Sequence, residues 1–386
     1  MPHAAQVDKG ASARDNARRR CPVKITRVES TIVKLPFTQP GPPTGFFGRV
    51  FDTVDVLLVR VETDAGLTGW GEAFGYAVNE STKAALDSYI GPACVGRDAT
   101  QIGTLRADLL KRFHNLGRGG PSIFGLSGID IALWDLAGKA AGLPLHRLLG
   151  GGARTEITAY ASFFRYGDAS VVARITEGAV KEGYRYVKLH EITEPAVRAA
   201  RQGGGPEMKL TVDTNCPWTP VEALEMARRF RPHDLLWLEE PVWPPEDWAG
   251  LARVRQEGGI ALAAGENASN PIDFKHMFDA GAVTYAQPSV TKIGGVTALR
   301  EVGILAEAAG VTLVPHSPYF GPGLLATLHF LAAQPREPLV ERIYATLEPD
   351  LFNGFTNARA GLLAVPQGPG LGVDPDPAVI ARYKTA

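Results

Sequence analysis

Beyond residue 153 the chain contains eight short apolar runs, and each run ends in a polar or charged residue. Successive ends lie 23 to 27 residues apart, which is room for one strand, one helix and their connections. Strands that alternate with helices form parallel sheets, and eight of them can close into a barrel whose functional groups lie at the carboxyl ends of the strands. The polar residues at those ends are Ser162, Lys188, Asp213, Glu239, Glu266, Ser289, His316 and Glu341.

The first part of the chain has a different pattern of composition and secondary-structure signals. Residues 1–22 are small, polar and charged, so we expect a disordered tail. Residues 23–152 read as strands followed by helices, an α+β arrangement that ends at the glycine run 150–152. Ser127 with Asp130 three residues later predicts a capping box at the start of a helix. We therefore expect a first domain at 23–152 and a barrel domain from residue 153 to about residue 359.

Composition excludes several classes of function. The chain has 40 Lys and Arg against 41 Asp and Glu, so it lacks the basic excess of a nucleic-acid-binding protein. No apolar run reaches the roughly 20 residues of a membrane helix, and no signal-peptide pattern is present. Three cysteines are too few and too scattered for a disulfide framework. We therefore expect a cytoplasmic protein without nucleic-acid or membrane partners.

Three consecutive predicted strands end in carboxylates, Asp213, Glu239 and Glu266. Neighbouring strands lie about 4.8 Å apart, so these groups repel one another unless a cation lies between them. Oxygen ligands suit a hard ion such as Mg²⁺. The alternative is that each carboxylate pairs with an Arg or Lys. Glu240 competes with Glu239, but strand alternation sends the two side chains to opposite faces, and we favour Glu239.

Candidate bases lie on both sides of this triad. Lys188 and His190 are two residues apart, so both point into the barrel mouth from the strand before Asp213. His316 ends the seventh strand, across the barrel. A lysine can hold a carboxylate, and an imidazole can move a proton near neutral pH. The pattern indicates proton transfer at a carbon next to a carboxylate, although either histidine alone could be structural.

These residues make the chain resemble the enolase superfamily. Within that superfamily it resembles the mandelate racemase subgroup of the mandelate racemase and muconate lactonizing enzyme family. The resemblance covers nearly everything from about residue 23 onward. Besides the carboxylate motifs, it rests on Gly-Leu-Thr-Gly-Trp-Gly-Glu (66–72), Ser-Gly-Ile-Asp-Ile-Ala-Leu-Trp-Asp (127–135), Leu-Leu-Gly-Gly (148–151), Lys-Ile-Gly-Gly (292–295) and Gly-Pro-Gly-Leu-Gly (368–372).

The resemblance implies an α/β fold, a modified TIM barrel of the (β/α)₇β type with an N-terminal α+β capping domain that residues 360–386 complete. It implies Mg²⁺ held by Asp213, Glu239 and Glu266, and an ene-diolate formed by removing the proton α to a carboxylate. It also implies that Glu341 hydrogen-bonds the substrate carboxylate, although its neighbour Arg342 allows a structural ion pair instead.

Two positions depart from the family pattern. The second strand usually carries Lys-x-Lys, and here His190 stands at the position of the second lysine. Family members with a histidine on strand seven usually orient it with an Asp at the end of strand six, where this chain has Ser289. A serine cannot stabilise an imidazolium as a carboxylate does. We therefore expect His190 to abstract the proton, Lys188 to hold charge on the substrate carboxylate, and His316 to act as a general acid.

One base and one acid favour elimination, so we predict a dehydratase acting on a hydroxy acid or acid sugar. A racemase, epimerase or cycloisomerase stays open, as does a barrel that binds a carboxylate without turnover. One feature opposes an acid sugar. Aromatic residues expected at the mouth suit a less hydroxylated acid or a cyclic amino-acid derivative, unless the rings are packing between lid and barrel: Phe46, Phe47, Phe163, Phe164, Trp218, Tyr319 and Phe320.

The Pro- and Gly-rich loop 36–49 is expected to act as a lid. Residues expected to contact substrate are Phe46, Phe47, Arg49, Ser162, Asn215, Ser289 and Tyr319, with Arg165 as a further cation near the mouth. Lys292 and Glu240 are expected beside the metal ligands. The expected partners are a small-molecule carboxylate and further copies of the chain.

Overall fold

The structure is a computed structural model that describes residues 23–46, 49–152 and 154–385. The expected tail and Phe47 lie outside the described residues. For Phe46 and Arg49 only the backbone is described, as parts of a short antiparallel hairpin formed by β2 (Gly45–Phe46) and β3 (Arg49–Val50). The expectation that the loop forms a lid therefore stays a prediction.

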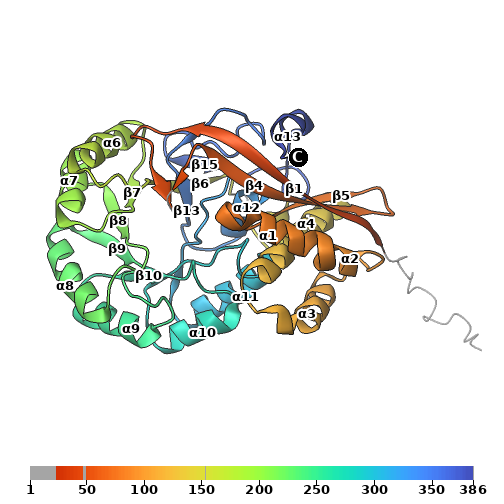
Figure 1. The fold of residues 1–386 in the computed structure, drawn as a ribbon, viewed down its shortest axis with the longest axis horizontal. Helices are drawn as coiled ribbons and strands as arrows, with labels where there is room; N and C mark the ends of the chain where they lie inside the picture. Colours follow the sequence, from red (N-terminus) through yellow and green to blue (C-terminus); the bar gives the residue numbers. More distant parts are fainter. Residues whose placement is uncertain (1–22, 47–48, 153, 386) are drawn as a thin grey trace, which may run out of the picture.

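An antiparallel sheet and a group of helices form the capping region (Figure 1). The sheet order is β14-β1-β4-β5, from β14 (Thr346–Leu347), β1 (Ile25–Thr38), β4 (Thr53–Thr63) and β5 (Thr68–Ala73). The helices are η1 (Tyr76–Val78), α1 (Asn79–Ala85), η2 (Leu86–Ile90), α2 (Gly91–Cys94), α3 (Ile102–Arg112), η3 (His114–Leu116), α4 (Pro121–Ala141) and α5 (Leu145–Leu148).

Eight parallel strands follow in the order β12-β11-β10-β9-β8-β7-β6-β13. They are β6 (Glu156–Ser162), β7 (Tyr186–Leu189), β8 (Lys209–Asp213), β9 (Leu235–Glu239), β10 (Leu262–Ala264), β11 (Tyr285–Ala286), β12 (Thr312–Leu313) and β13 (Leu339–Ile343). The helices between them are α6 (Ala169–Lys181), α7 (Glu194–Gly204), α8 (Pro220–Phe230), η4 (Arg231–His233), α9 (Trp248–Glu257), α10 (Pro271–Asp279), α11 (Gly295–Ala308) and α12 (Pro322–Ala332). Figure 1 shows α6 to α10 surrounding the strands. The predicted modified TIM barrel is confirmed.

The two regions exchange elements near the C-terminus. β14 lies inside the range expected for the barrel, yet it pairs with β1 of the cap. β15 (Leu362–Ala364) lies inside the range expected to complete the cap, yet it pairs with barrel strand β6. The last helix, α13 (Pro377–Tyr383), leads to Thr385, whose N–H donates to Ile32 O at 2.9 Å. The domain boundaries we gave stay a prediction.

The expected capping box at Ser127 is wrong, because α4 begins at Pro121 and Ser127 lies inside it. Ser127 Oγ instead accepts from Gly294 N at 2.9 Å, and Asp130 Oδ1 accepts from Thr297 N at 2.9 Å. Both side chains therefore satisfy N–H groups at the start of α11. The polar pair that resembles a local helix start is a tertiary contact between cap and barrel.

Apolar side chains fill the interior of the barrel below its polar ends. Tyr160, Trp237, Ala263 and Val314 form a buried cluster inside the strands. Alternation along β9 places Trp237 in this layer and Glu239 one layer above it, where Trp237 Nε1 donates to Glu239 Oε2 at 3.0 Å. The polar groups thus face the mouth. Within the described ranges, no helix is long and apolar enough to cross a membrane.

Candidate metal centre and active site

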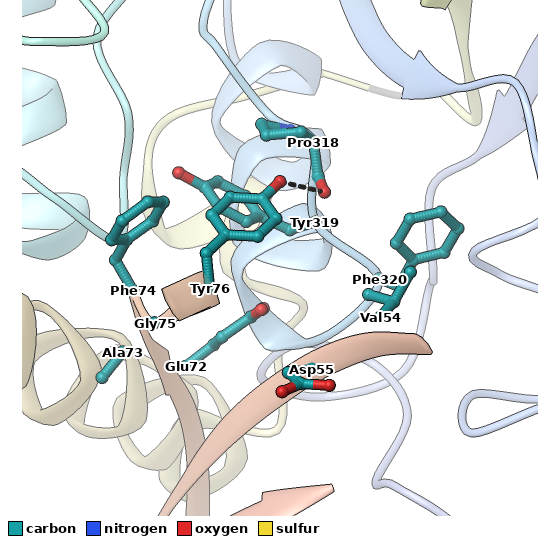
Figure 2. Close-up of a pocket in the computed structure, with 10 residues that line it drawn as sticks. All are labelled: Val54, Asp55, Glu72, Ala73, Phe74, Gly75, Tyr76, Pro318, Tyr319 and Phe320. Carbon is teal, nitrogen blue, oxygen red and sulfur yellow. Dashed lines mark hydrogen bonds between the residues drawn. The ribbon is translucent and has the colours of Figure 1, made fainter. Parts of the chain in front are cut away.

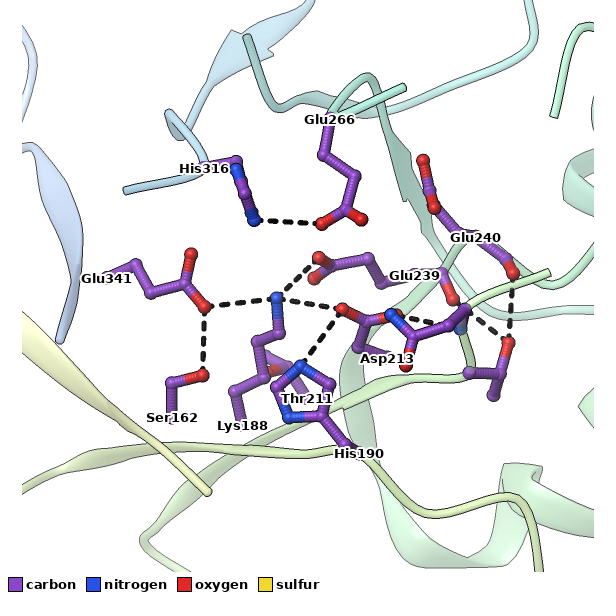
Figure 3. Close-up of polar contacts among 12 residues, drawn as sticks. Ser162, Lys188, His190, Thr211, Asp213, Glu239, Glu240, Glu266, His316 and Glu341 are labelled. Atoms are coloured by element: carbon purple, nitrogen blue, oxygen red, sulfur yellow. Dashed lines mark hydrogen bonds and ion pairs between the residues drawn. The ribbon is translucent and has the colours of Figure 1, made fainter. Parts of the chain in front are cut away.

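Three carboxylates meet at the carboxyl ends of adjacent strands (Figure 3). Asp213 ends β8, Glu239 ends β9, and Glu266 follows β10. One oxygen from each lies within 4.8 Å of the others. Asp213 and Glu239 are register partners, and both are fully buried. The carboxylates therefore converge on one point, as the alternation of the strands predicts.

The electrostatics of this point fit a divalent cation. Burial raises the pKa of Glu239 well above its ordinary value, and the nearby charges of Asp213 and Glu341 raise it further, although Lys188 opposes them. The excess of buried negative charge, carried on oxygen atoms, is the environment that Mg²⁺ prefers. These residues fit the ion that the sequence led us to expect.

Lys188 lies fully buried among three carboxylates. Its Nζ is 2.6 Å from Glu239 Oε1, 2.9 Å from Asp213 Oδ2 and 3.2 Å from Glu341 Oε1. Burial lowers the pKa of an ammonium, but these three charges outweigh it and hold the pKa of Lys188 well above its usual range. Lys188 is therefore a fixed positive charge at the floor of the site.

His190 faces the same carboxylates from the rim. Its Nε2 is 3.3 Å from Asp213 Oδ2, and its Nδ1 contacts the backbone carbonyl of Phe163. A carbonyl and a carboxylate oxygen only accept, so these two contacts are those of a ring with a proton on each nitrogen; when Nε2 gives up its proton, Nδ1–H stays on the carbonyl and Nε2 holds the lone pair. The geometry thus points the basic nitrogen of a neutral His190 into the site.

His316 lies on the opposite side. Its Nε2 is 3.0 Å from Glu266 Oε2, and its Nδ1 is 3.0 Å from Ser289 Oγ. Burial favours a raised pKa for Glu266, but the charge and hydrogen bond of His316 outweigh it and lower this pKa to about 2. Ser289 Oγ also contacts the hydroxyl of Tyr319. Ser289 and Tyr319, which we expected to contact substrate, therefore bond to each other, and Ser289 also bonds to His316.

Glu341 already has partners for both oxygens. Oε1 accepts from Ser162 Oγ at 2.8 Å and lies beside Lys188, and Oε2 accepts from Ser317 N at 3.0 Å. Arg342 does not pair with it among the described contacts. Its guanidinium instead lies 3.9 Å from the centre of the Phe320 ring and donates to Thr356 O. The structural ion pair we considered for Glu341 thus involves Lys188.

Of the two adjacent glutamates, Glu239 joins the triad. Glu240 turns away, and its Oε2 accepts from Asn267 Nδ2 at 2.8 Å.

Asn215 lies at the mouth of the barrel. Its N–H donates to Asp213 Oδ1 at 2.9 Å, and its side-chain oxygen accepts from Arg165 at 3.0 Å. Lys292 lies over the Phe74 ring, 5.0 Å from its centre. Arg165, the further cation expected near the mouth, is held at the rim by its bond to Asn215.

The aromatic residues near the mouth pack on one another where they are described. Phe164 stacks on Phe37 at 5.7 Å, and Trp218 packs against Phe230 at 6.2 Å between ring centres. Phe163 and Phe320 are fully buried. Phe163, Phe164 and Trp218 therefore serve as packing, which weakens the argument against a hydroxylated substrate, whereas Tyr319 and Phe320 line a small pocket.

Two cap residues that we did not single out also approach the barrel mouth (Figure 2). Tyr76 OH donates to Pro318 O at 3.3 Å, and Glu72 Oε2 accepts from Gly323 N at 2.7 Å. Burial raises the pKa of Glu72 to about 8. Both line a small pocket with Tyr319. Glu72 belongs to one of the motifs quoted above, but only the docking of the cap places it near the barrel.

Comparison with known proteins agrees with this arrangement. Residues 29–150 match the family described as mandelate racemase / muconate lactonizing enzyme, N-terminal domain, and residues 170–379 match the enolase C-terminal domain-like family. A D-galactarolactone cycloisomerase of Agrobacterium fabrum is 34% identical over 343 residues, covering 84% of this chain and 90% of that protein. An arabinonate dehydratase of Saccharolobus solfataricus is 29% identical, covering 86% and 91%.

A solved structure shares the whole fold. The crystal structure of a racemase from Streptomyces coelicolor A3(2) with bound magnesium superposes with a TM-score of 0.83 at 30% identity, covering 94% of this chain and 100% of that one. The similarity spans cap and barrel together. The sequence-based expectation of a lyase or isomerase agrees with the names of these relatives.

Proposed function

Since this chain belongs to the mandelate racemase and muconate lactonizing enzyme family of the enolase superfamily, we propose that it is a Mg²⁺-dependent dehydratase of an acid sugar. The observation that carries this proposal is the placement of two imidazoles on opposite sides of one carboxylate triad. His190 contacts Asp213, and His316 contacts Glu266. Relatives named for sugar-acid dehydration and cycloisomerisation support the substrate class.

Asp213, Glu239 and Glu266 would hold the metal. When bound, a divalent cation supplies positive charge beside the carboxylate oxygens of the substrate, where negative charge develops as the α-proton leaves. We expect EDTA to abolish turnover and Mg²⁺ to restore it, and Glu239→Gln to remain inactive after Mg²⁺ is added. Full turnover by Glu239→Gln would refute this ligand assignment.

His190 is the proposed base. The bond from its Nδ1 to the Phe163 carbonyl leaves Nε2 as the acceptor that faces the site. Lys188, a permanent charge on the same side, would hold a carboxylate oxygen of the substrate. Removing the α-proton places its electron pair between the α and β carbons, and the bond to the β-oxygen then breaks.

His316 is the proposed acid, because it approaches from the other side and its Nε2 faces the site. It would give its proton to the departing β-hydroxyl, which leaves as water, and the enol that remains becomes a keto acid. A racemase would need His316 to match His190 as a base. The absence of a carboxylate at Ser289 weakens that alternative.

A cycloisomerase is the second candidate, favoured by the 34% identity to a relative of that name. The same base and acid would act, but the departing β-oxygen would belong to a ring and stay attached to the product. Substrate and product would then have equal mass, whereas dehydration removes one water. Mass spectrometry of products from a library of acid sugars and their lactones separates the two outcomes.

Proton exchange with deuterated solvent tests the roles of the histidines. We expect His190→Asn to lose both turnover and α-proton exchange, and His316→Asn to lose turnover but keep exchange. His114→Asn, at an exposed site in the cap, serves as the matched control. The opposite pattern would reverse the two roles. Loss of exchange from only one enantiomer in each variant would favour a racemase, and no exchange with any acid would favour a binding protein.

A further inference from the structure

Arg165 lies across the carboxyl ends of two neighbouring barrel strands. It comes three residues after the end of β6, and its side chain bonds to the first backbone carbonyl beyond β7 and the first beyond β8. Nε donates to His190 O at 2.5 Å, and Nη2 donates to Thr214 O at 3.2 Å. The guanidinium is therefore held at the rim of the mouth, beside the residue proposed as the base.

The hydrogen bonds of Arg165 leave one edge of its guanidinium without a protein partner. Nη2 also donates to Asn215 Oδ1 at 3.0 Å, so the donors of Nε and Nη2 are committed to neutral oxygens. Within the described ranges, Nη1 has no hydrogen-bond partner and no carboxylate pairs with this exposed side chain. A guanidinium that is already ordered and carries an unneutralised charge is well suited to bind an anion.

The loop after β8 is shaped to meet Arg165. Asn215 and Cys216 have φ of +54° and +55°, a left-handed conformation that is uncommon outside glycine. Hydrogen bonds hold this turn, from Asn215 N to Asp213 Oδ1 at 2.9 Å and from Cys216 N to Glu240 O at 2.7 Å. Strain that neighbouring contacts maintain is typical of functional sites. Here the turn places Asn215 between a proposed metal ligand and the cation at the rim.

We propose that Arg165 binds a second carboxylate of the substrate, so that the acid sugar is an aldaric acid, which carries a carboxylate at each end. The proposal rests on the proposed function, which places the reacting carboxylate beside the metal and Lys188. His190 connects the two ends, because its ring lies 3.3 Å from Asp213 and its own carbonyl bonds to Arg165 (Figure 3).

The charge of Arg165 favours a carboxylate over a hydroxyl at the far end of the substrate. Hydrogen bonds between two charged groups are about twice as strong as those between neutral groups. A terminal hydroxyl would accept from Nη1 but would leave the positive charge unpaired. Arg165 is thus a specificity-determining residue in this proposal, and it takes no part in moving the proton.

Matched pairs of acid sugars test the proposal. Galactarate and galactonate differ only at C6, which is a carboxylate in the first and a hydroxymethyl group in the second, and glucarate and gluconate form a second such pair. We expect the wild-type enzyme to have the higher kcat/KM for the dicarboxylate. Arg165→Met should lower the ratio of the two kcat/KM values roughly ten- to hundredfold. Arg165→Lys should fall between, because lysine keeps the charge but not the planar fork.

Arg154→Met is the matched control. Arg154 also donates to a backbone carbonyl, that of Arg336 at 3.4 Å, but it precedes β6 and so lies at the opposite end of the barrel. This variant should leave both kcat/KM values unchanged. If Arg165 serves only to tie β7 to β8, Arg165→Met would lower both values by the same factor. An unchanged ratio, or a wild-type preference for the monocarboxylate, would overturn the proposal.

Binding separates this proposal from the proposed function. Calorimetry with the His190→Asn protein and Mg²⁺ measures affinity for each acid without turnover. We expect the dicarboxylate of a pair to bind more tightly, and the double variant with Arg165→Met to lose the difference. Equal affinities in the His190→Asn protein would overturn the second-carboxylate site. If the wild-type protein converts no acid, the proposed function fails, while the difference in affinity still decides whether Arg165 binds a carboxylate.

Discussion

Replacing Lys188 with Met should destabilise the metal-free protein and tighten its affinity for Mg²⁺. Methionine preserves much of the length of the side chain but removes the charge. The ammonium of Lys188 lies between 2.6 and 3.2 Å from oxygens of Asp213, Glu239 and Glu341, and none of the four side chains is exposed by more than 1%. The variant therefore leaves three buried carboxylates without this cation.

The size of the effect follows from this burial. Removing one partner of a buried ion pair costs about 3–5 kcal/mol, because the remaining charge stays desolvated. Mg²⁺ would neutralise two of the same carboxylates and so recover part of the loss. A recovery of about 1.5 kcal/mol corresponds to a roughly tenfold tighter dissociation constant.

The stability of the Lys188→Met variant should also depend on pH. Burial and neighbouring charge already raise the pKa of Glu239, and without Lys188 this pKa should rise further. A carboxyl whose folded pKa exceeds its unfolded one binds more protons when folded, so stability falls as pH rises through that interval. The destabilisation of Lys188→Met in EDTA should therefore be greatest at high pH and shrink as pH falls toward the ordinary pKa of a carboxyl group.

Urea unfolding in EDTA and in Mg²⁺, with calorimetric titration of Mg²⁺, measures these effects. Lys181→Met is the control: Lys181 pairs with Glu177 at 2.6 Å, but its side chain is 72% exposed, so the change should cost less than about 1 kcal/mol. Weaker Mg²⁺ binding by Lys188→Met, or a loss of stability no larger than that of the control, would refute the reasoning.

Three further outcomes follow from the contacts described. Burial raises the pKa of Glu72 from 4.5 to about 8, so the stability of the folded protein should fall as pH rises between those values. Glu72→Gln should flatten this pH dependence and add roughly 2–4 kcal/mol to the free energy of unfolding above pH 8, as followed by thermal unfolding. Thr219 forms a complete capping box at the start of α8, and Thr219→Ala should cost about 1 kcal/mol in urea unfolding. Gly265 has φ of +137°, and a Cβ there would lie 2.7 Å from the Phe274 ring, so Gly265→Ala should lower the melting temperature and weaken Mg²⁺ binding through Glu266, as measured by calorimetry.

Much of the site can be predicted from the sequence because strand geometry is periodic. The spacing of the polar ends predicts the eight parallel strands, and alternation predicts that Lys188 and His190 share a face while Glu239 and Glu240 do not. Those inferences need only the local rule that side chains alternate along a strand. The convergence of Asp213, Glu239 and Glu266 follows from the same rule, applied to neighbouring strands.

The remaining features depend on contacts between residues far apart in the chain, which no local pattern encodes. Ser127 and Asp130 resemble a helix cap, yet they bond to the start of α11, more than 160 residues away. The partners of His316 are another example: the sequence shows that Ser289 replaces a carboxylate, but only the loop between β12 and α12 brings Tyr319 to the Ser289 hydroxyl. The sequence by itself thus determined the barrel and the chemical groups at its mouth, because these follow from periodicity. The tertiary structure decided which hydrogen-bond partners those groups find, because partners are set by distance in space and not along the chain.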